Sequence, residues 1–139
     1  MARYYIDTCV WRDYYEDRVG PGGRPLGEHA TRMLIRIIGN KEIIILSDVV
    51  MRELKGFYSS DEIELMLGTI LKVGKVIKIE VKTEETTEAS ILSKSRRLPI
   101  LDAMHAIIAR NNNAVLISQD KHFQNLKDIV KVIRPDELI

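Results

Sequence analysis

Apolar stretches of strand length alternate along this chain with amphipathic stretches of helix length. The predicted strands are residues 3–7, 42–47, 76–81, 115–118 and 130–133, and helical segments separate most of them. This alternation is typical of an α/β fold in which helices cover both faces of a parallel sheet. We therefore predict a three-layer α/β/α domain with a central, mainly parallel sheet.

Apolar spacing and end residues together place the predicted helices. These are residues 9–15, 28–38, 48–57, 59 onward, 83–96 and 102–110, with a short helical turn at 121–126. Asp48 and Thr83 are expected to cap the helices that they open. Ser59 and Glu62 have the spacing of a capping box, which marks the start of another helix.

The composition fits one folded domain. Of the 139 residues, 45% are hydrophobic and 29% are charged, which supplies one core and leaves no compositionally simple stretch. We expect a single domain over residues 1–139. The only cysteine, Cys9, cannot form an internal disulfide and no secretion signal opens the chain, so we expect a cytoplasmic protein. The apolar runs are too short to cross a bilayer.

Two aspartates stand directly after predicted strands. Asp7 ends the first strand, and Asp120 follows the strand at residues 115–118. Ligands bind parallel α/β sheets in the crevice at the carboxyl ends of the strands. We therefore expect Asp7 and Asp120 to lie at the same rim of the sheet.

Two further acids occupy positions that an acid with a purely structural role would avoid. Helical spacing places Glu53 on the same face as Val49, Val50 and Phe57, among core side chains. A buried carboxylate without a partner is costly, so Glu53 needs a cation, a metal or hydrogen-bond donors. Asp102 stands in the first turn of an almost wholly apolar helix, whose amino end should lie at the rim of Asp7 and Asp120.

Each acid also has a simpler explanation. Asp102 could complement the dipole of its helix, and Asp120 could be a turn residue. Glu53 could form a buried salt bridge, and the candidate partners are Arg32, Arg36 and Arg52. No histidine and cysteine set has zinc spacing, and no nucleophile elbow or phosphate-binding loop is present. Taken together, the four acids favour a site of oxygen ligands for a hard divalent cation.

Four short segments resemble the PIN domain family, and within it the small VapC-type toxins and their archaeal relatives. They are Tyr5-Ile6-Asp7-Thr8, the stretch from Leu46 to Leu54 around Glu53, Leu98-Pro99-Ile100-Leu101-Asp102-Ala103, and Leu116-Ile117-Ser118-Gln119-Asp120-Lys121-His122-Phe123. Each segment is short, but their order and separation are specific. The resemblance covers nearly the whole chain.

This resemblance implies a PIN-like nuclease domain that cleaves single-stranded RNA internally. It implies a Mg²⁺ or Mn²⁺ site made by Asp7, Glu53, Asp102 and Asp120, at which metal-activated water attacks the phosphodiester. Thr8 and Ser118 would support the cluster. An antitoxin protein and a second copy of the chain are implied as partners. The glycine- and proline-rich loop between residues 20 and 27 is longer than expected of a minimal toxin. A loop of this length could cover the crevice, so substrate choice and partner binding stay open.

Several neighbours of these acids are candidates for weaker roles. Arg52, Arg96 and Lys121 could contact the RNA backbone, although each could equally be a solvated surface charge. His105 lies on the helix face of Asp102, three residues later, where a packed or surface histidine is the simpler interpretation. For the aromatic residues near position 14 we favour core packing or a dimer contact over base stacking; these are Trp11, Tyr14 and Tyr15.

Two other functions remain open. A phosphotransfer domain of the receiver or haloacid-dehalogenase type shares this fold class, but both types need a second acid close to the first-strand aspartate, and the dehalogenase type has it where this chain carries Cys9. A non-catalytic RNA- or protein-binding module could use the same scaffold. The complete set of four acids favours the nuclease over this module.

Overall fold

Five parallel strands form the centre of the computed structural model, which describes residues 1–139. The strand order is β3-β2-β1-β4-β5, and every hydrogen-bonded pair of neighbours is parallel. The strands are β1 (Arg3–Ile6), β2 (Ile43–Ser47), β3 (Lys75–Ile79), β4 (Val115–Ile117) and β5 (Val132–Ile133). The prediction of a central parallel sheet is confirmed.

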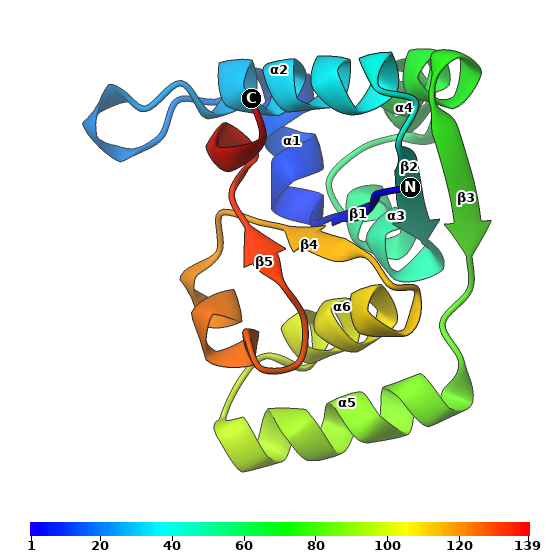
Figure 1. The fold of residues 1–139 in the computed structure, drawn as a ribbon, viewed down its shortest axis with the longest axis vertical. Helices are drawn as coiled ribbons and strands as arrows, with labels where there is room; N and C mark the ends of the chain where they lie inside the picture. The colour runs from blue at the N-terminus through cyan, green and yellow to red at the C-terminus, as the bar shows by residue number, and fades with distance from the viewer.

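Helices cover both faces of this sheet (Figure 1). The α-helices before β3 are α1 (Thr8–Glu16), α2 (Leu26–Gly39), α3 (Asp48–Lys55) and α4 (Ser60–Val73). The α-helices after it are α5 (Thr83–Arg96) and α6 (Ile100–Asn111). Figure 1 shows α1 and α2 on one side of the sheet and α6 on the other, with α5 outside α6. The three-layer prediction is confirmed. No helix combines the length and the apolar character that crossing a membrane would require.

The central strands and α6 form the middle of the core. Tyr5 and Ile6 of β1 and Ile44 and Ile45 of β2 are fully buried, as expected for strands covered on both faces. In α6 every residue from 103 to 109 is buried, because this helix lies between the sheet and α5. This placement explains why this stretch of α6 has almost no polar residues and why its one histidine, His105, is buried.

The order of the strands reverses between β1 and β4. The chain leaves β1 through α1 on one side of the sheet and enters β4 from α6 on the other. Ligand crevices of open α/β sheets lie at this switch point, outside the carboxyl ends of the strands. Asp7 directly follows β1 and Ser118 directly follows β4, so both residues stand at that crevice.

Helix ends were predicted less accurately than helices. The capping box of Ser59 and Glu62 is present, but Asp48 and Thr83 are the first residues of their helices and not their caps. Ser47 caps α3 instead, since its Oγ accepts a hydrogen bond from the backbone N–H of Val50 at 3.2 Å. These two helices begin at Asp48 and Thr83 themselves, one residue earlier than predicted.

Candidate metal centre

A cleft of about 150 Å³ opens at the carboxyl ends of β1 and β4. Its lining residues are Asp7, Thr8, Cys9, Arg12, Glu53, Phe57, Asp102 and Asp120. All four acids selected from the sequence therefore line one cleft. They come from four different segments, with Asp7 after β1, Glu53 in α3, Asp102 in the first turn of α6 and Asp120 after β4.

Asp7 and Asp120 are joined through the hydroxyl group of Ser118. The Oγ atom of Ser118 donates to Oδ2 of Asp7 at 2.8 Å and accepts from the backbone N–H of Asp120 at 2.9 Å. The backbone N–H of Asp7 donates to the carbonyl of Ile117 at 3.0 Å, which ties the ends of β1 and β4 together. These bonds fix the two aspartates relative to each other, and Asp7 is buried.

Cys9 is a further neighbour of Asp7 in the cleft. Its Sγ atom donates to Oδ2 of Asp7 at 2.9 Å. Burial, and then the charge of Asp7, raise the pKa of the Cys9 thiol well above its ordinary value. The protonated thiol is therefore a hydrogen-bond donor to Asp7 and not a soft metal ligand at neutral pH.

Glu53 is held by donors from two other elements. Its Oε1 atom lies 2.5 Å from Nε2 of His105 and accepts from Oγ1 of Thr8 at 3.0 Å. Burial raises the pKa of Glu53, but the hydrogen bonds and the charge of His105 outweigh burial, so the pKa lies below its ordinary value. The alternative salt bridge to an arginine is not formed, because Glu53 pairs only with His105.

The apolar stripe around Glu53 is shorter than the sequence indicated. Val49 and Val50 are buried, but Phe57 has 55% of its surface exposed. The reason is that α3 ends at Lys55, so Phe57 lies beyond the helix and reaches the rim of the cleft. There the guanidinium group of Arg12 lies 3.7 Å from the centre of the Phe57 ring. Arg12 was not predicted from the sequence as a site residue.

His105 connects Glu53 to a buried chain of hydroxyl groups. Its Nδ1 atom lies 2.6 Å from the Tyr5 hydroxyl, which lies 2.7 Å from Oγ of Ser47. Burial lowers the pKa of His105, but the bond to Glu53 and the charge of Asp7 raise it more, so the pKa lies above its ordinary value. Both ring nitrogens are engaged, so His105 is a packed residue that also holds Glu53.

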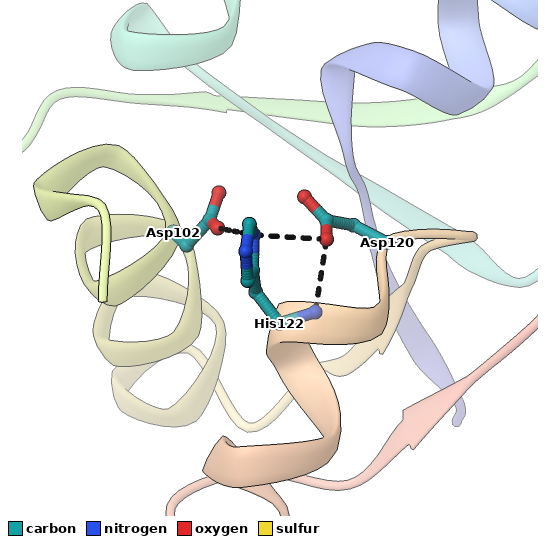
Figure 2. A group of neighbouring side chains, drawn as sticks. All are labelled: Asp102, Asp120 and His122. Atoms are coloured by element: carbon teal, nitrogen blue, oxygen red, sulfur yellow. Dashed lines mark hydrogen bonds and ion pairs between the residues drawn. The ribbon is translucent and has the colours of Figure 1, made fainter. Parts of the chain in front are cut away.

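His122 lies between the other two carboxylates (Figure 2). Its Nδ1 atom is 3.1 Å from Oδ2 of Asp102 and 3.1 Å from Oδ1 of Asp120. Burial, then the charges of Asp120 and Asp7, raise the pKa of Asp102 to about 6, even though His122 lowers it. Asp102 and Asp120 therefore share one partner, His122, in this half of the cleft. His122 was not predicted from the sequence as a site residue.

The simpler explanations for Asp120 and Asp102 are partly correct. Oδ1 of Asp120 accepts the backbone N–H of His122 at 2.9 Å and so caps η2 (Lys121–Leu126), a 3₁₀ helix. Asp102 makes no capping hydrogen bond, although it lies in the first turn of α6. A structural role therefore accounts for one oxygen of Asp120, but it does not account for the half-buried carboxylate of Asp102.

The donor set of the cleft fits a hard divalent cation. Three aspartates and one glutamate supply oxygen atoms, and burial together with the charges of Asp120 and Asp7 raises the pKa of Asp102. Oxygen-rich sites with few nitrogen ligands suit Mg²⁺ and Mn²⁺. Asp102, Asp120 and His122 each place one candidate ligand atom within 4.8 Å of the others, so these three residues could hold a metal ion together.

Other residues selected from the sequence lie outside the cleft. Arg52 and Lys121 are exposed next to Glu53 and Asp120 in the chain, whereas Arg96 is paired with Asp128 through two contacts of 2.7 Å. Of the aromatic residues, Trp11 is buried in the core, and Tyr14 and Tyr15 pack against it. Core packing, one of the two interpretations favoured for these aromatic residues, is therefore confirmed.

The loop at residues 20–27 does not cover the crevice. None of these residues lines the cleft, and the loop extends beside the carboxyl terminus (Figure 1). Arg24 instead lies 3.7 Å from Asp136 in the final 3₁₀ helix, η3 (Pro135–Leu138). Gly22 and Gly23 adopt positive φ angles of 70° and 78°, which explains why the loop needs glycine.

Comparisons with known proteins agree with this architecture. A family model described as PIN domain matches residues 4–129. The fold is similar to that of VapBC2 from Rickettsia felis, solved bound to a DNA fragment from the promoter, with a TM-score of 0.68, 16% identity and coverage of 95% of this chain and 98% of that one. Comparison with curated proteins gives no match.

Two further solved structures have the same fold. One is a toxin-antitoxin complex from Klebsiella pneumoniae, with a TM-score of 0.64, 16% identity and coverage of 95% of this chain and 97% of that one. The other is VapBC-5 of Mycobacterium tuberculosis, a member of the VapBC family of toxin-antitoxin systems, with a TM-score of 0.55, 15% identity and coverage of 96% and 99%. At these identities the likeness concerns the fold.

Proposed function

The chain belongs to the PIN domain family, and on this premise we propose that it is a metal-dependent endoribonuclease that hydrolyses phosphodiester bonds in single-stranded RNA. One observation carries the proposal. Asp7, Glu53, Asp102 and Asp120 line a single cleft at the switch point of the sheet, although they are far apart in the sequence. A structural origin would have to explain four separate acids meeting at the one edge where such sheets bind ligands.

The four carboxylates would hold Mg²⁺ or Mn²⁺. When bound, the metal would supply an activated water and neutralise charge on the scissile phosphate. The protein's own residues fix the ligands. Ser118 orients Asp7 and Asp120, and Thr8 and His105 orient Glu53. Preorganised carboxylates avoid the cost of rearrangement when the substrate binds.

Cations near the cleft would hold the RNA backbone. Arg12 lines the cleft itself, and Lys121 follows Asp120 with its side chain exposed. Arg52 is exposed beside Glu53 in α3. Arg96 would have to give up its ion pair with Asp128 to contact phosphate, and Arg12 likewise pairs with Glu16, so we assign both a smaller contribution than Arg52 and Lys121. Contacts of this kind give affinity without sequence preference.

We further propose that the protein is the toxin of a toxin-antitoxin pair and works in the cytoplasm. Support for the antitoxin comes from the similar folds, two of which belong to toxin-antitoxin systems. An antitoxin segment that enters the cleft would shield the carboxylates from RNA. Copurification of a small protein encoded beside this chain, with loss of RNA cleavage in the complex, would support this role.

A second copy of the chain is the proposed partner of an apolar groove. The groove lies between α2 and α4, has a volume of about 370 Å³, and is lined mainly by apolar residues, among them Ile35 and Val73. Ile35 has 66% of its surface exposed. Contiguous exposed apolar surface marks interaction sites. Light scattering should report a dimer for the wild type. Ile35→Glu should dissociate this dimer, whereas Ile91→Glu, at an exposed position in α5, should leave it intact.

Cleavage of labelled single-stranded RNA tests the nuclease directly. The assay compares the wild type with Asp7→Asn and Asp120→Asn in Mg²⁺ or Mn²⁺, with chelator added in parallel. Asp61→Asn, at an exposed position in α4, is the matched control. We expect cleavage by the wild type and by the control only, and none with chelator.

Two results would contradict the nuclease. Cleavage that survives Asp7→Asn would mean a contaminant or a different centre. Failure of the wild type to cleave varied RNAs, with metal bound, would favour the non-catalytic binding module.

A further inference from the structure

His122 brings a nitrogen atom into a cleft that is otherwise rich in oxygen. It comes from η2, while Asp102 comes from α6 and Asp120 from the segment between β4 and η2 (Figure 2). Its side chain is the most exposed of the three, so it is open to solvent and to ions. No core contact requires an imidazole at this position.

The spacing of the three side chains is that of ligands around one cation. Octahedral coordination at about 2.1 Å places neighbouring ligand atoms about 3.0 Å apart. Nδ1 of His122 lies 3.1 Å from one oxygen of Asp102 and 3.1 Å from one oxygen of Asp120. All three candidate ligand atoms lie within 4.8 Å of one another.

We propose that Asp102, Asp120 and His122 form a mixed nitrogen and oxygen site that prefers a first-row transition ion, such as Mn²⁺, over Mg²⁺. Imidazole suits transition ions, whereas Mg²⁺ favours carboxylate, carbonyl and water ligands. The inference deepens the proposed function and rests on its metal centre, but it does not depend on RNA cleavage. It assigns metal selectivity to a residue outside the four carboxylates.

The other histidine near the cleft is not available for this role. Nε2 of His105 contacts Glu53 at 2.5 Å and Nδ1 contacts the Tyr5 hydroxyl at 2.6 Å, so both of its ring nitrogens are engaged. The ring is also buried in the core. A nitrogen ligand detected on a bound ion would therefore come from His122.

Pulsed EPR of Mn²⁺ added to the metal-free protein tests the assignment, because coupling to ¹⁴N reports a directly bound imidazole. Titration calorimetry supplies the affinities for Mn²⁺ and Mg²⁺ separately. The variants are His122→Ala and, as matched control, His29→Ala on α2, which lies outside the cleft. Circular dichroism confirms that each variant is folded.

We expect ¹⁴N coupling in the wild type and in His29→Ala, and none in His122→Ala. Loss of His122 should weaken Mn²⁺ binding by about tenfold or more, while Mg²⁺ binding should change by less than about threefold. Coupling that persists in His122→Ala, or Mn²⁺ and Mg²⁺ affinities that fall equally, would overturn the inference and leave the carboxylate centre standing. A wild type that binds neither ion would overturn both the inference and the proposed metal centre.

Discussion

Nε2 of His105 lies 2.5 Å from Oε1 of Glu53, and this contact joins α6 to α3. On its other side the imidazole contacts the Tyr5 hydroxyl of β1. The carboxylate of Glu53 is thus oriented by residues that the fold, and not the local sequence, brings to it. A half-buried acid that has no arginine partner is stabilised in this way without losing its place in the cleft.

Replacing His105 with Met should raise the pKa of Glu53 in the metal-free protein. Burial still raises the pKa of Glu53 in this variant, but His105, the principal donor that lowers it, is lost. The Tyr5 hydroxyl also loses a partner, so the free energy of unfolding at pH 7 should fall by roughly 1–3 kcal/mol. NMR titration of the Glu53 carboxyl carbon and urea unfolding measure the two effects.

The sign of the pH dependence follows from the lowered pKa. Glu53 stabilises the fold above its unfolded-state pKa, and this contribution is lost as the pH falls through its folded-state pKa. The stability difference between wild type and His105→Met should therefore shrink below about pH 4. His29→Met is the control. A Glu53 titration that is the same in wild type and His105→Met would contradict the role of the contact.

Asp102→Asn should stabilise the metal-free protein at pH 7.5. The pKa of Asp102 is raised to about 6, above its unfolded-state value, so the ionised form is disfavoured by folding. The destabilising effect is full above pH 6 and disappears as the pH falls below the unfolded-state pKa, near 4. We expect a gain on the order of 1–2 kcal/mol at pH 7.5 and none near pH 4.

Saturating Mn²⁺ or Mg²⁺ should reverse the sign of this effect. The wild type then gains stability from the bound ion, and Asp102→Asn gains less because it has lost a ligand. Thermal unfolding of the wild type and Asp102→Asn, with and without metal, at pH 7.5 and near pH 4, measures both effects. If Asp102→Asn is destabilised without metal at pH 7.5, then Asp102 is a structural acid and not a strained ligand.

The positions of the acids could be predicted because topology decides them. A parallel sheet places the residues that follow its strands at one edge, so the sequence alone indicated that Asp7 and Asp120 meet. The amino end of α6 reaches the same edge for the same reason, which brings Asp102 there. The fold itself followed from the alternation of apolar and amphipathic stretches. The ends of the helices and strands differed, and the short 3₁₀ helices at Pro21–Gly23 and Pro135–Leu138 were not predicted.

The contacts around the acids could not be predicted, because they depend on side-chain packing between distant segments. His105 and Tyr5 are 100 positions apart in the chain. His122 reaches Asp102 only because η2 turns directly after Asp120. Nothing in the local sequence distinguishes such a histidine from an ordinary surface residue. Phe57 was placed on the wrong surface because the apolar pattern continues beyond the end of α3.

Gly27→Ala should destabilise the protein, and Gly68→Ala should stabilise it. A Cβ atom at Gly27 would lie 2.5 Å from the Cα atom of Asp17, so the backbones of α1 and α2 would have to move apart. A Cβ atom at Gly68, inside α4, meets nothing within 4 Å. Alanine there should add about 0.5–1 kcal/mol through helix propensity. Urea unfolding measures both, and stabilisation by Gly27→Ala would refute the close approach of the two helices.

Removing the Ser118 hydroxyl should impair RNA cleavage strongly, because this single neutral group joins Asp7 and Asp120. Ser118→Ala removes the hydroxyl that donates to Asp7 and accepts from the backbone of Asp120. Substitution of groups that orient metal ligands lowers metal affinity or activity by roughly 10- to 100-fold. We therefore expect a loss of this size in RNA cleavage, with the protein still folded.

Ser118→Thr separates the hydroxyl from the size of the side chain, because threonine keeps the hydroxyl group. It should recover most of the activity that Ser118→Ala loses, while Ser95→Ala, at an exposed position in α5, should have no effect. Cleavage rates measured over a range of Mn²⁺ concentrations locate the defect. Recovery of Ser118→Ala at high Mn²⁺ would place it in metal binding, as expected if the hydroxyl holds Asp7 and Asp120 in position. Full activity of Ser118→Ala at low Mn²⁺ would show that the two aspartates do not need the bridge.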